Sequence, residues 1–180
     1  MAGKISAWPS PTRAVANRGV FLRNLSMTQS TETQELVLER VFDAPRRLVY
    51  RAFTDPDQLA RWFGPVGWSV PRETVDMDVR VGGHQKLVMV NNQDSSQTAP
   101  LNATFTEVIE NELLVGSQEA PSQFGLPPGT KMHLRLEFHE LDGKTRLILH
   151  QGPFLAHMAH GTREGWTSSF TKLDALLAVA

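Results

Sequence analysis

Residues 41–64 constrain the fold of this chain more than any other segment, because they combine the end of a strand, two short helices and a stop. Pro45 suits the first position of a helix, where its missing N–H leaves no hydrogen bond unmade. Apolar residues then recur at helical spacing, which indicates a helix with one buried side. This apolar stripe consists of Leu48, Val49, Ala52 and Phe53.

A second short helix is predicted directly after the first. Asp55 can accept hydrogen bonds from the first free amides, Pro56 suits the next position, and Gln58 can reach back as in a capping box. Gly64 and Pro65 then end the helix. The buried side of this helix consists of Leu59, Trp62 and Phe63.

Most of the remaining chain alternates between apolar and polar residues, which is typical of half-buried strands. A first strand over 35–42 places Val37 and Val41 on one face. The paired glycines at 82–83 and the Asp-Gly pair at 142–143 mark tight turns. Hairpin links make neighbouring strands antiparallel, and we expect about seven strands. The further predicted strands are 75–81, 87–90, 103–109, 113–115, 131–139 and 145–151.

A long final helix is predicted over 161–177, where apolar residues recur at i, i+4, i+7 and i+11. These residues are Trp166, Phe170, Leu173 and Leu177. Only the concave side of the sheet is large enough to bury this stripe. The predicted fold class is therefore α+β: an antiparallel curved sheet of about seven strands wrapped around a long C-terminal helix, with two short helices after the first strand.

Composition limits the compartment and the partners. Residues 1–32 lack a regular pattern, so we expect a disordered extension there and a single domain over 33–180. Residues 1–26 hold four basic residues and no acid, which leaves 14 basic and 19 acidic residues in the rest of the chain and disfavours nucleic-acid binding. The chain has no cysteine, and no apolar run approaches the ~18 residues of a membrane span. We therefore expect a cytoplasmic protein.

Six segments together make the chain similar to a known family. They are 41–45, 54–56, 62–65, 77–83, 105–108 and 165–166, the last taken together with Leu173. In this order they resemble the activator-of-heat-shock-chaperone-ATPase-like proteins, within the START/birch-allergen-like (SRPBCC) superfamily of helix-grip folds. The resemblance implies a seven-stranded antiparallel sheet that grips the C-terminal helix around an internal cavity. It implies no single function and no shared catalytic motif.

Eleven residues are candidates for the wall of such a cavity. Phe53, Trp62 and Phe63 are equally suited to a pocket or to the core, whereas Trp166 and Phe170 favour the core. The resemblance also places polar residues, Arg80 and Glu107 among them, near cavities of this kind. Where the family often has a large apolar residue, this chain has Gln85. The candidates are Phe53, Trp62, Phe63, Arg80, Gln85, Leu87, Met89, Phe105, Leu136, Trp166 and Phe170.

Motifs for catalysis, phosphate binding or metal binding are weak. The chain shows no Ser-His-Asp set and no phosphate-cradling glycine loop. His157, His160 and Glu164 stand at i, i+3 and i+7, a spacing that puts metal ligands on one helical face. Gly161 weakens the helix there, and we expect a solvated first turn rather than a metal. His133 and His139 are expected on the solvent face of their strand. We expect no catalytic residue, no metal and no cofactor.

Three functional hypotheses remain open. The first is a binding protein for a small hydrophobic or amphipathic molecule, which we favour because the fold supplies a cavity and the sequence supplies no reacting group. The second is a chaperone co-activator or stress-response interaction module, with a chaperone as partner. The third is a cavity enzyme, cyclase-like or hydrolase-like, with an inward polar pair. In each case we expect a monomer or a weak homodimer.

Overall fold

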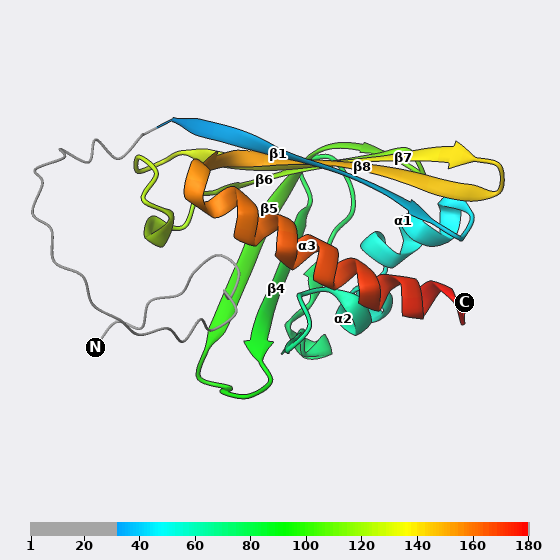
Figure 1. Cartoon of the computed structure of the whole chain (residues 1–180), viewed down its shortest axis with the longest axis horizontal. Helices are drawn as coiled ribbons and strands as arrows, with labels where there is room; N and C mark the ends of the chain where they lie inside the picture. The colour runs from blue at the N-terminus through cyan, green and yellow to red at the C-terminus, as the bar shows by residue number, and fades with distance from the viewer. Residues whose placement is uncertain (1–31, 180) are drawn as a thin grey trace, which may run out of the picture.

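The computed structural model describes residues 32–179, so the predicted extension over 1–32 lies outside the described residues, except for Glu32. The described chain forms one antiparallel sheet of eight strands in the order β1-β8-β7-β6-β5-β4-β2, with β3 paired to β4. Figure 1 shows the long helix α3 crossing one face of this sheet, with α1 and α2 beside its C-terminal half. The predicted helix-grip fold is confirmed, with one short strand at 68–69 that was not predicted and a two-residue strand, 76–77, where the longer strand 75–81 was expected.

The elements have the following bounds: β1 Thr33–Phe42, α1 Arg46–Thr54, α2 Pro56–Trp62, β2 Trp68–Ser69, η1 Arg72–Thr74, β3 Asp76–Met77, β4 His84–Asn91, β5 Thr98–Ile109, β6 Leu113–Glu119, η2 Ser122–Phe124, β7 Lys131–Leu141, β8 Lys144–Leu155 and α3 Ala156–Leu177.

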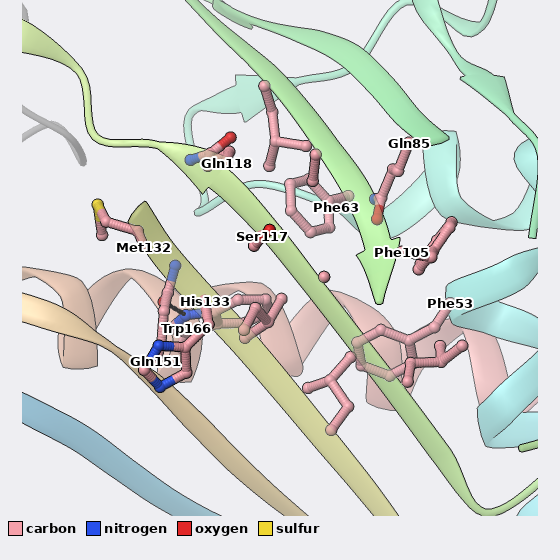
Figure 2. Close-up of a pocket in the computed structure, with 16 residues that line it drawn as sticks. Phe53, Phe63, Gln85, Phe105, Ser117, Gln118, Met132, His133, Gln151 and Trp166 are labelled. Atoms are coloured by element: carbon pink, nitrogen blue, oxygen red, sulfur yellow. Dashed lines mark hydrogen bonds between the residues drawn. The ribbon is translucent and has the colours of Figure 1, made fainter. Parts of the chain in front are cut away.

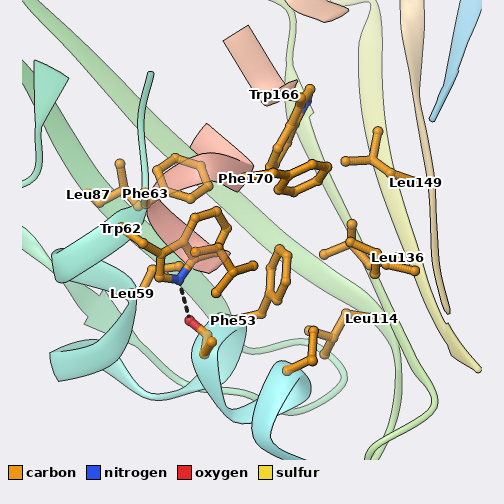
Figure 3. Packing of buried hydrophobic residues seen from close by; sticks show 14 of the residues in the cluster. Phe53, Leu59, Trp62, Phe63, Leu87, Leu114, Leu136, Leu149, Trp166 and Phe170 are labelled. Carbon is orange, nitrogen blue, oxygen red and sulfur yellow. Dashed lines mark hydrogen bonds between the residues drawn. The ribbon is translucent and has the colours of Figure 1, made fainter. Parts of the chain in front are cut away.

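The two short helices are joined by the predicted cap. The Asp55 carboxylate accepts hydrogen bonds from the backbone amides of Asp57, at 2.9 Å, and Gln58, at 3.2 Å. Helix α2 then buries Trp62, whose indole Nε1 donates to the carbonyl of Ala52 at 2.9 Å (Figure 3). The Phe53 and Trp62 rings meet edge to face, with centroids 4.8 Å apart. The helix pair is therefore held by one aromatic contact and one buried hydrogen bond.

Helix α3 begins at Ala156, five residues before the predicted start. Gly161 lies inside the helix, because a single glycine weakens a helix without ending it. The predicted stripe faces the sheet: Trp166, Phe170 and Leu173 are buried. The Phe170 ring meets the Phe42 ring of β1 edge to face, at 5.4 Å between centroids. The last helix therefore connects the first strand of the fold to its core.

The predicted strand over 75–81 is wrong beyond Met77. The chain turns instead, with the Arg80 amide donating to the Asp78 carbonyl and the Gly83 amide donating to the Arg80 carbonyl. Val81, which the alternation placed on a buried face, is 61 % exposed. The alternation of valines is compatible with a strand. In the folded chain, however, the backbone amides of Arg80 and Gly83 bond to carbonyls of the same short segment.

The outer face of the sheet is charged. On β1, Val37 and Val41 lie on this face and are 45 % and 44 % exposed, whereas Leu36 and Phe42 are buried against the core. Ion pairs tie the neighbouring strands together, including Glu39 with Arg146 at 2.8 Å. The Glu35 carboxylate lies 2.9 Å from His133 Nε2 and 3.4 Å from His150 Nδ1. His133 and His139 are half exposed, as predicted. Across residues 32–179, no helix is long and apolar enough to cross a membrane.

The Glu35 cluster predicts a pH dependence of stability. Hydrogen bonding to His133 lowers the pKa of Glu35 below 4.5, with a smaller contribution from His150. A carboxyl whose pKa is lower in the folded state stabilises the fold above its unfolded pKa, and this stabilisation is lost as pH falls through the folded pKa. We expect Glu35→Gln to flatten the loss of stability below about pH 4.5, measured by urea unfolding between neutral and acidic pH. Glu73→Gln, at an exposed position of η1, should retain the wild-type slope.

Candidate functional site

A cavity lies between the concave face of the sheet and the N-terminal half of α3. It has a narrow inner part of about 50 Å³ and a wider outer part of about 370 Å³. Residues that border both parts form the neck of the cavity. These are Phe63, Leu101, Gln118, Met132, Leu134, Gln151 and Trp166. Figure 2 shows Phe53, Phe105 and Gln85 on one side of the inner part and Met132, Gln151 and Trp166 on the other.

The inner part exists because two small residues face it from neighbouring strands. Ala103 of β5 pairs with Gln85 of β4, and Phe105 pairs with Gly116 of β6. A Cβ atom placed on Gly116 would lie 3.7 Å from the Cβ of Ala103, at ordinary van der Waals distance. Larger side chains at these two positions would therefore occupy the space. The remaining walls are the apolar side chains of Phe53, Leu114 and Leu136.

Gln85 supplies an amide at the inner end. It precedes Leu87 and Met89 on the inward face of β4, and its side chain is only partly exposed. Within residues 32–179 no group forms a hydrogen bond with this amide, although it lies among aromatic rings (Figure 2). The inner part therefore offers the two N–H donors and the acceptor oxygen of one amide group to a bound molecule.

Two further amides stand at the neck. The Gln151 side-chain oxygen accepts a hydrogen bond from the Trp166 indole Nε1 at 2.7 Å. The Gln118 side-chain oxygen accepts a longer hydrogen bond, 3.4 Å, from the Asn102 backbone amide. Both glutamines lie on inward positions of their strands. Gln118 pairs with Met132 of β7 and Gln151 pairs with Leu134, the next inward residue of β7, so the two glutamines lie diagonally across this strand.

The outer part is covered by the segment around η2. Phe124 of η2 is buried and its ring lies 6.5 Å from the ring of Phe154 on β8. Gly125 follows with φ of 69°, a left-handed conformation that reverses the chain at this point. The end of the β4–β5 hairpin forms the opposite wall with Met89 and Pro100. The cavity thus opens between a short loop, a hairpin and the start of α3.

The family profile described as Activator of Hsp90 ATPase homolog 1-like protein matches residues 43–178. The chain belongs to this family. No curated protein shows significant similarity to it.

Solved structures support the same assignment. A protein of Chromobacterium violaceum is 27 % identical, with a TM-score of 0.70, and the match covers 79 % of this chain and 96 % of the other. A protein of Nitrosomonas europaea is 27 % identical, with a TM-score of 0.67 and coverage of 80 % and 94 %. The AHSA1 protein of Silicibacter pomeroyi is 27 % identical, with a TM-score of 0.65 and coverage of 81 % and 99 %.

Within this family fold, most of the predicted site residues meet at the cavity. Trp166, expected in the core, lines both parts of it as well as being buried. The predicted residues at the cavity are Phe53, Phe63, Gln85, Met89, Phe105, Leu136 and Trp166. Trp62, Leu87 and Phe170 instead fill the core behind it (Figure 3).

Arg80 does not lie at the cavity. Its side chain is 70 % exposed and pairs with Asp78 at 2.8 Å, because the 78–83 turn directs it outwards. Glu107 is also on the outer side, where it lies 3.9 Å from Arg135. The inward polar pair on which the enzyme hypothesis depended is therefore not formed by these two residues.

Sequence reasoning missed several residues of the cavity wall. Gly116 had a usable signal, because glycine inside a strand often marks a close approach or an open space. Gln118 and Gln151 follow inward apolar positions at period two. The predicted strand 113–115 ended before Gln118, whereas Gln151 closed the predicted strand 145–151 but was not considered for the cavity wall. The missed residues of the inner part are Leu101, Ala103, Leu114, Gly116, Ser117, Gln118, Met132, His133, Leu134 and Gln151.

Lys172 of α3 fastens the segment that carries Phe63. Its Nζ donates to the carbonyls of Gly64 and Trp68, both at 3.0 Å. Burial lowers the pKa of Lys172 from 10.5. Ser168 reinforces the attachment, since its hydroxyl oxygen accepts a hydrogen bond from the backbone amide of Val66 in the loop that follows Phe63. This arrangement holds Phe63 in position at the neck.

The His157, His160 and Glu164 spacing brings only two of these side chains together in the described structure. His160 lies 3.2 Å from Glu164 at the exposed start of α3. In the part of the chain that the structure describes, no three metal-binding side chains converge.

Proposed function

We propose that this protein binds a small hydrophobic or amphipathic molecule in the cavity between α3 and the sheet. The observation that supports this most strongly is the unfilled inner part, which is walled by Phe53 and Phe105 and contains the amide of Gln85, a group with no hydrogen bond to any described residue. Ligand sites typically combine a mostly apolar wall with a few placed polar groups. A hollow built from Ala103 and Gly116 provides space that larger residues would fill.

The chemistry of the wall supports binding rather than catalysis. The polar side chains at the neck are amides, which donate and accept hydrogen bonds but exchange no proton near neutral pH. His133 borders the cavity, but its imidazole lies against Glu35 on the outer face. General acid–base catalysis requires a titrating group within hydrogen-bond reach of the ligand.

The family description also names activation of a chaperone ATPase. Such a role would use the outer surface of the domain, and a chaperone partner stays a second hypothesis. Binding of a small molecule is favoured here because the cavity is a specific observation on this chain, whereas the chaperone role follows only from the family description.

We expect Gly116→Leu to weaken binding of a neutral fluorescent probe such as N-phenyl-1-naphthylamine. The leucine side chain would project into the inner part, where the Ala103 Cβ is already at contact distance. Affinity should fall by about tenfold or more, which corresponds to ~1.4 kcal/mol. Fluorescence titration measures the affinity, and thermal unfolding shows whether the variant is folded.

Two variants make this test specific. Ala103→Leu fills the same space from the neighbouring strand and should have the same effect on binding. Gly161→Leu adds the same side chain to α3 at a position with no heavy atom within 4 Å, and should leave binding unchanged. If the probe binds equally well to folded Gly116→Leu and Ala103→Leu, it does not use the inner part of this cavity, and the proposed mode of binding is wrong.

A further inference from the structure

We propose that the neck of the cavity selects a neutral molecule with a hydrogen-bond-accepting oxygen, of the aryl ketone, ester or amide class. This inference rests on the proposed binding function and specifies its ligand. It follows from which atoms of Gln151 and Gln118 are already occupied, and from the absence of charge on the wall.

The orientation of the Gln151 amide is set by its neighbour. The Trp166 indole N–H donates hydrogen bonds and accepts none, so the Gln151 group 2.7 Å away must be the amide oxygen. The amide nitrogen of Gln151, with two N–H donors, is thereby directed elsewhere. No acceptor for this nitrogen occurs within residues 32–179. Gln151 borders both parts of the cavity, so these donors are available at the neck.

Gln118 follows the same rule with a weaker contact. The backbone amide of Asn102 donates to its side-chain oxygen at 3.4 Å, and a backbone amide also cannot accept. The Gln118 nitrogen likewise has no acceptor among the described residues, and this side chain also borders both parts. Both side chains border the same space, and a ligand oxygen there can accept from their amide nitrogens.

The lack of charge on the wall favours a neutral ligand. Among the residues that the structure describes, the wall of both parts includes no Lys, Arg, Asp or Glu. A carboxylate moved from water into such a wall would lose hydration with no cation to compensate. A carbonyl oxygen has the acceptor lone pairs without this penalty. Lys172 is directed to backbone carbonyls of the 63–68 segment and does not serve as a counter-ion.

The two volumes suggest how the molecule lies. The outer part, about 370 Å³, has room for an aromatic body beside Phe124 and Phe154. The inner part, about 50 Å³, has room only for a small substituent such as a methyl group. A carbonyl at the neck, with an aryl group on one side and a methyl group on the other, fits both parts. An aryl methyl ketone has this arrangement.

The test compares three probes of nearly the same shape: 2-acetylnaphthalene, 2-ethylnaphthalene and 2-naphthoate. The ketone should bind roughly five- to tenfold more tightly than the ethyl compound, as expected for one net hydrogen bond. It should also bind more tightly than the carboxylate. Isothermal titration calorimetry on the full chain gives the three affinities at one pH and salt concentration.

Gln151→Glu is the decisive variant. A carboxylate still accepts from the Trp166 indole N–H, so that contact is retained, but both amide donors are removed. The preference for the ketone over the ethyl compound should fall from roughly five- to tenfold to about twofold or less, because the hydrogen bond is lost. Gln118→Glu should reduce the preference to a smaller extent. Gln58→Glu, on α2 and away from the cavity, introduces the same charge and should leave the preference intact.

The outcomes separate the two proposals. If ketone and ethyl compound bind equally well to the wild-type protein, the cavity binds ligands but does not select an acceptor, and this inference is wrong. If the carboxylate binds best, the neutrality argument fails. If none of the three binds, the proposed binding function fails together with the inference. Retention of the preference in folded Gln151→Glu would also overturn the role assigned to Gln151.

Discussion

Replacing Trp62 by alanine is expected to lower the free energy of unfolding by about 3–5 kcal/mol, the usual range for truncating a buried tryptophan. Trp62 is fully buried, and its ring contacts those of Phe53 and Phe63. The same change leaves the Ala52 carbonyl without the indole N–H that donates to it at 2.9 Å. Denaturant unfolding followed by circular dichroism measures the loss, which is a large part of a typical total stability of roughly 5–15 kcal/mol.

Trp62→Phe separates packing from hydrogen bonding. It retains most of the aromatic burial and removes only the indole donor, so we expect a smaller loss of about 1–3 kcal/mol. Val66→Ala, at an exposed position of the following loop, should change stability by less than about 0.5 kcal/mol. If Trp62→Ala shifts the denaturant midpoint no more than Val66→Ala does, Trp62 is not at the centre of the core.

Replacing Gly83 by alanine should destabilise the protein by about 3 kcal/mol, at the upper end for overpacking. A Cβ atom on Gly83 would lie 2.0 Å from the carbonyl oxygen of Asp78 and 3.0 Å from that of Arg80. Both atoms belong to the backbone, so no flexible side chain can move away. The 78–83 turn would have to open, and its hydrogen bonds to β5 through Gly82 would be strained. Thermal and urea unfolding measure the effect.

Gly161→Ala provides a control of the same chemical change with the opposite expected sign. No heavy atom lies within 4 Å of the position a Cβ would take on Gly161, and the residue lies inside α3. Alanine should stabilise a helix interior by about 0.5–1 kcal/mol relative to glycine. Equal destabilisation by Gly83→Ala and Gly161→Ala would show that the contact with Asp78 does not explain the requirement for glycine.

Local sequence was sufficient to predict most of the architecture. The Asp55 cap and its following proline mark α2, and the Asp142-Gly143 turn marks the β7–β8 hairpin. Turn chemistry of this kind depends on a few adjacent residues, which the sequence displays directly. The stripe of α3 is similarly visible, because a helix that crosses a sheet must present one apolar face to it.

The candidate site was predicted only in part. Phe53 and Phe105 were identified because large apolar residues on inward positions are visible from periodicity. Arg80 was misplaced, because alternation could not distinguish a continued strand from a turn closed by its own hydrogen bonds. Gly116 and Ala103 were overlooked, because their importance lies in the side-chain volume that they lack.

The sequence by itself thus determined the kinds of element, their order and the side of each that faces inward, because these depend on neighbours within a few residues. Tertiary structure alone decided that a hollow remains beside Gln85 and that Gln151 presents its donors there. The physical reason is that both depend on atoms from separate strands and a distant helix. Ala103 and Gly116 leave space only when they become neighbours across β5 and β6, and Trp166 fixes the Gln151 amide only when α3 crosses β8.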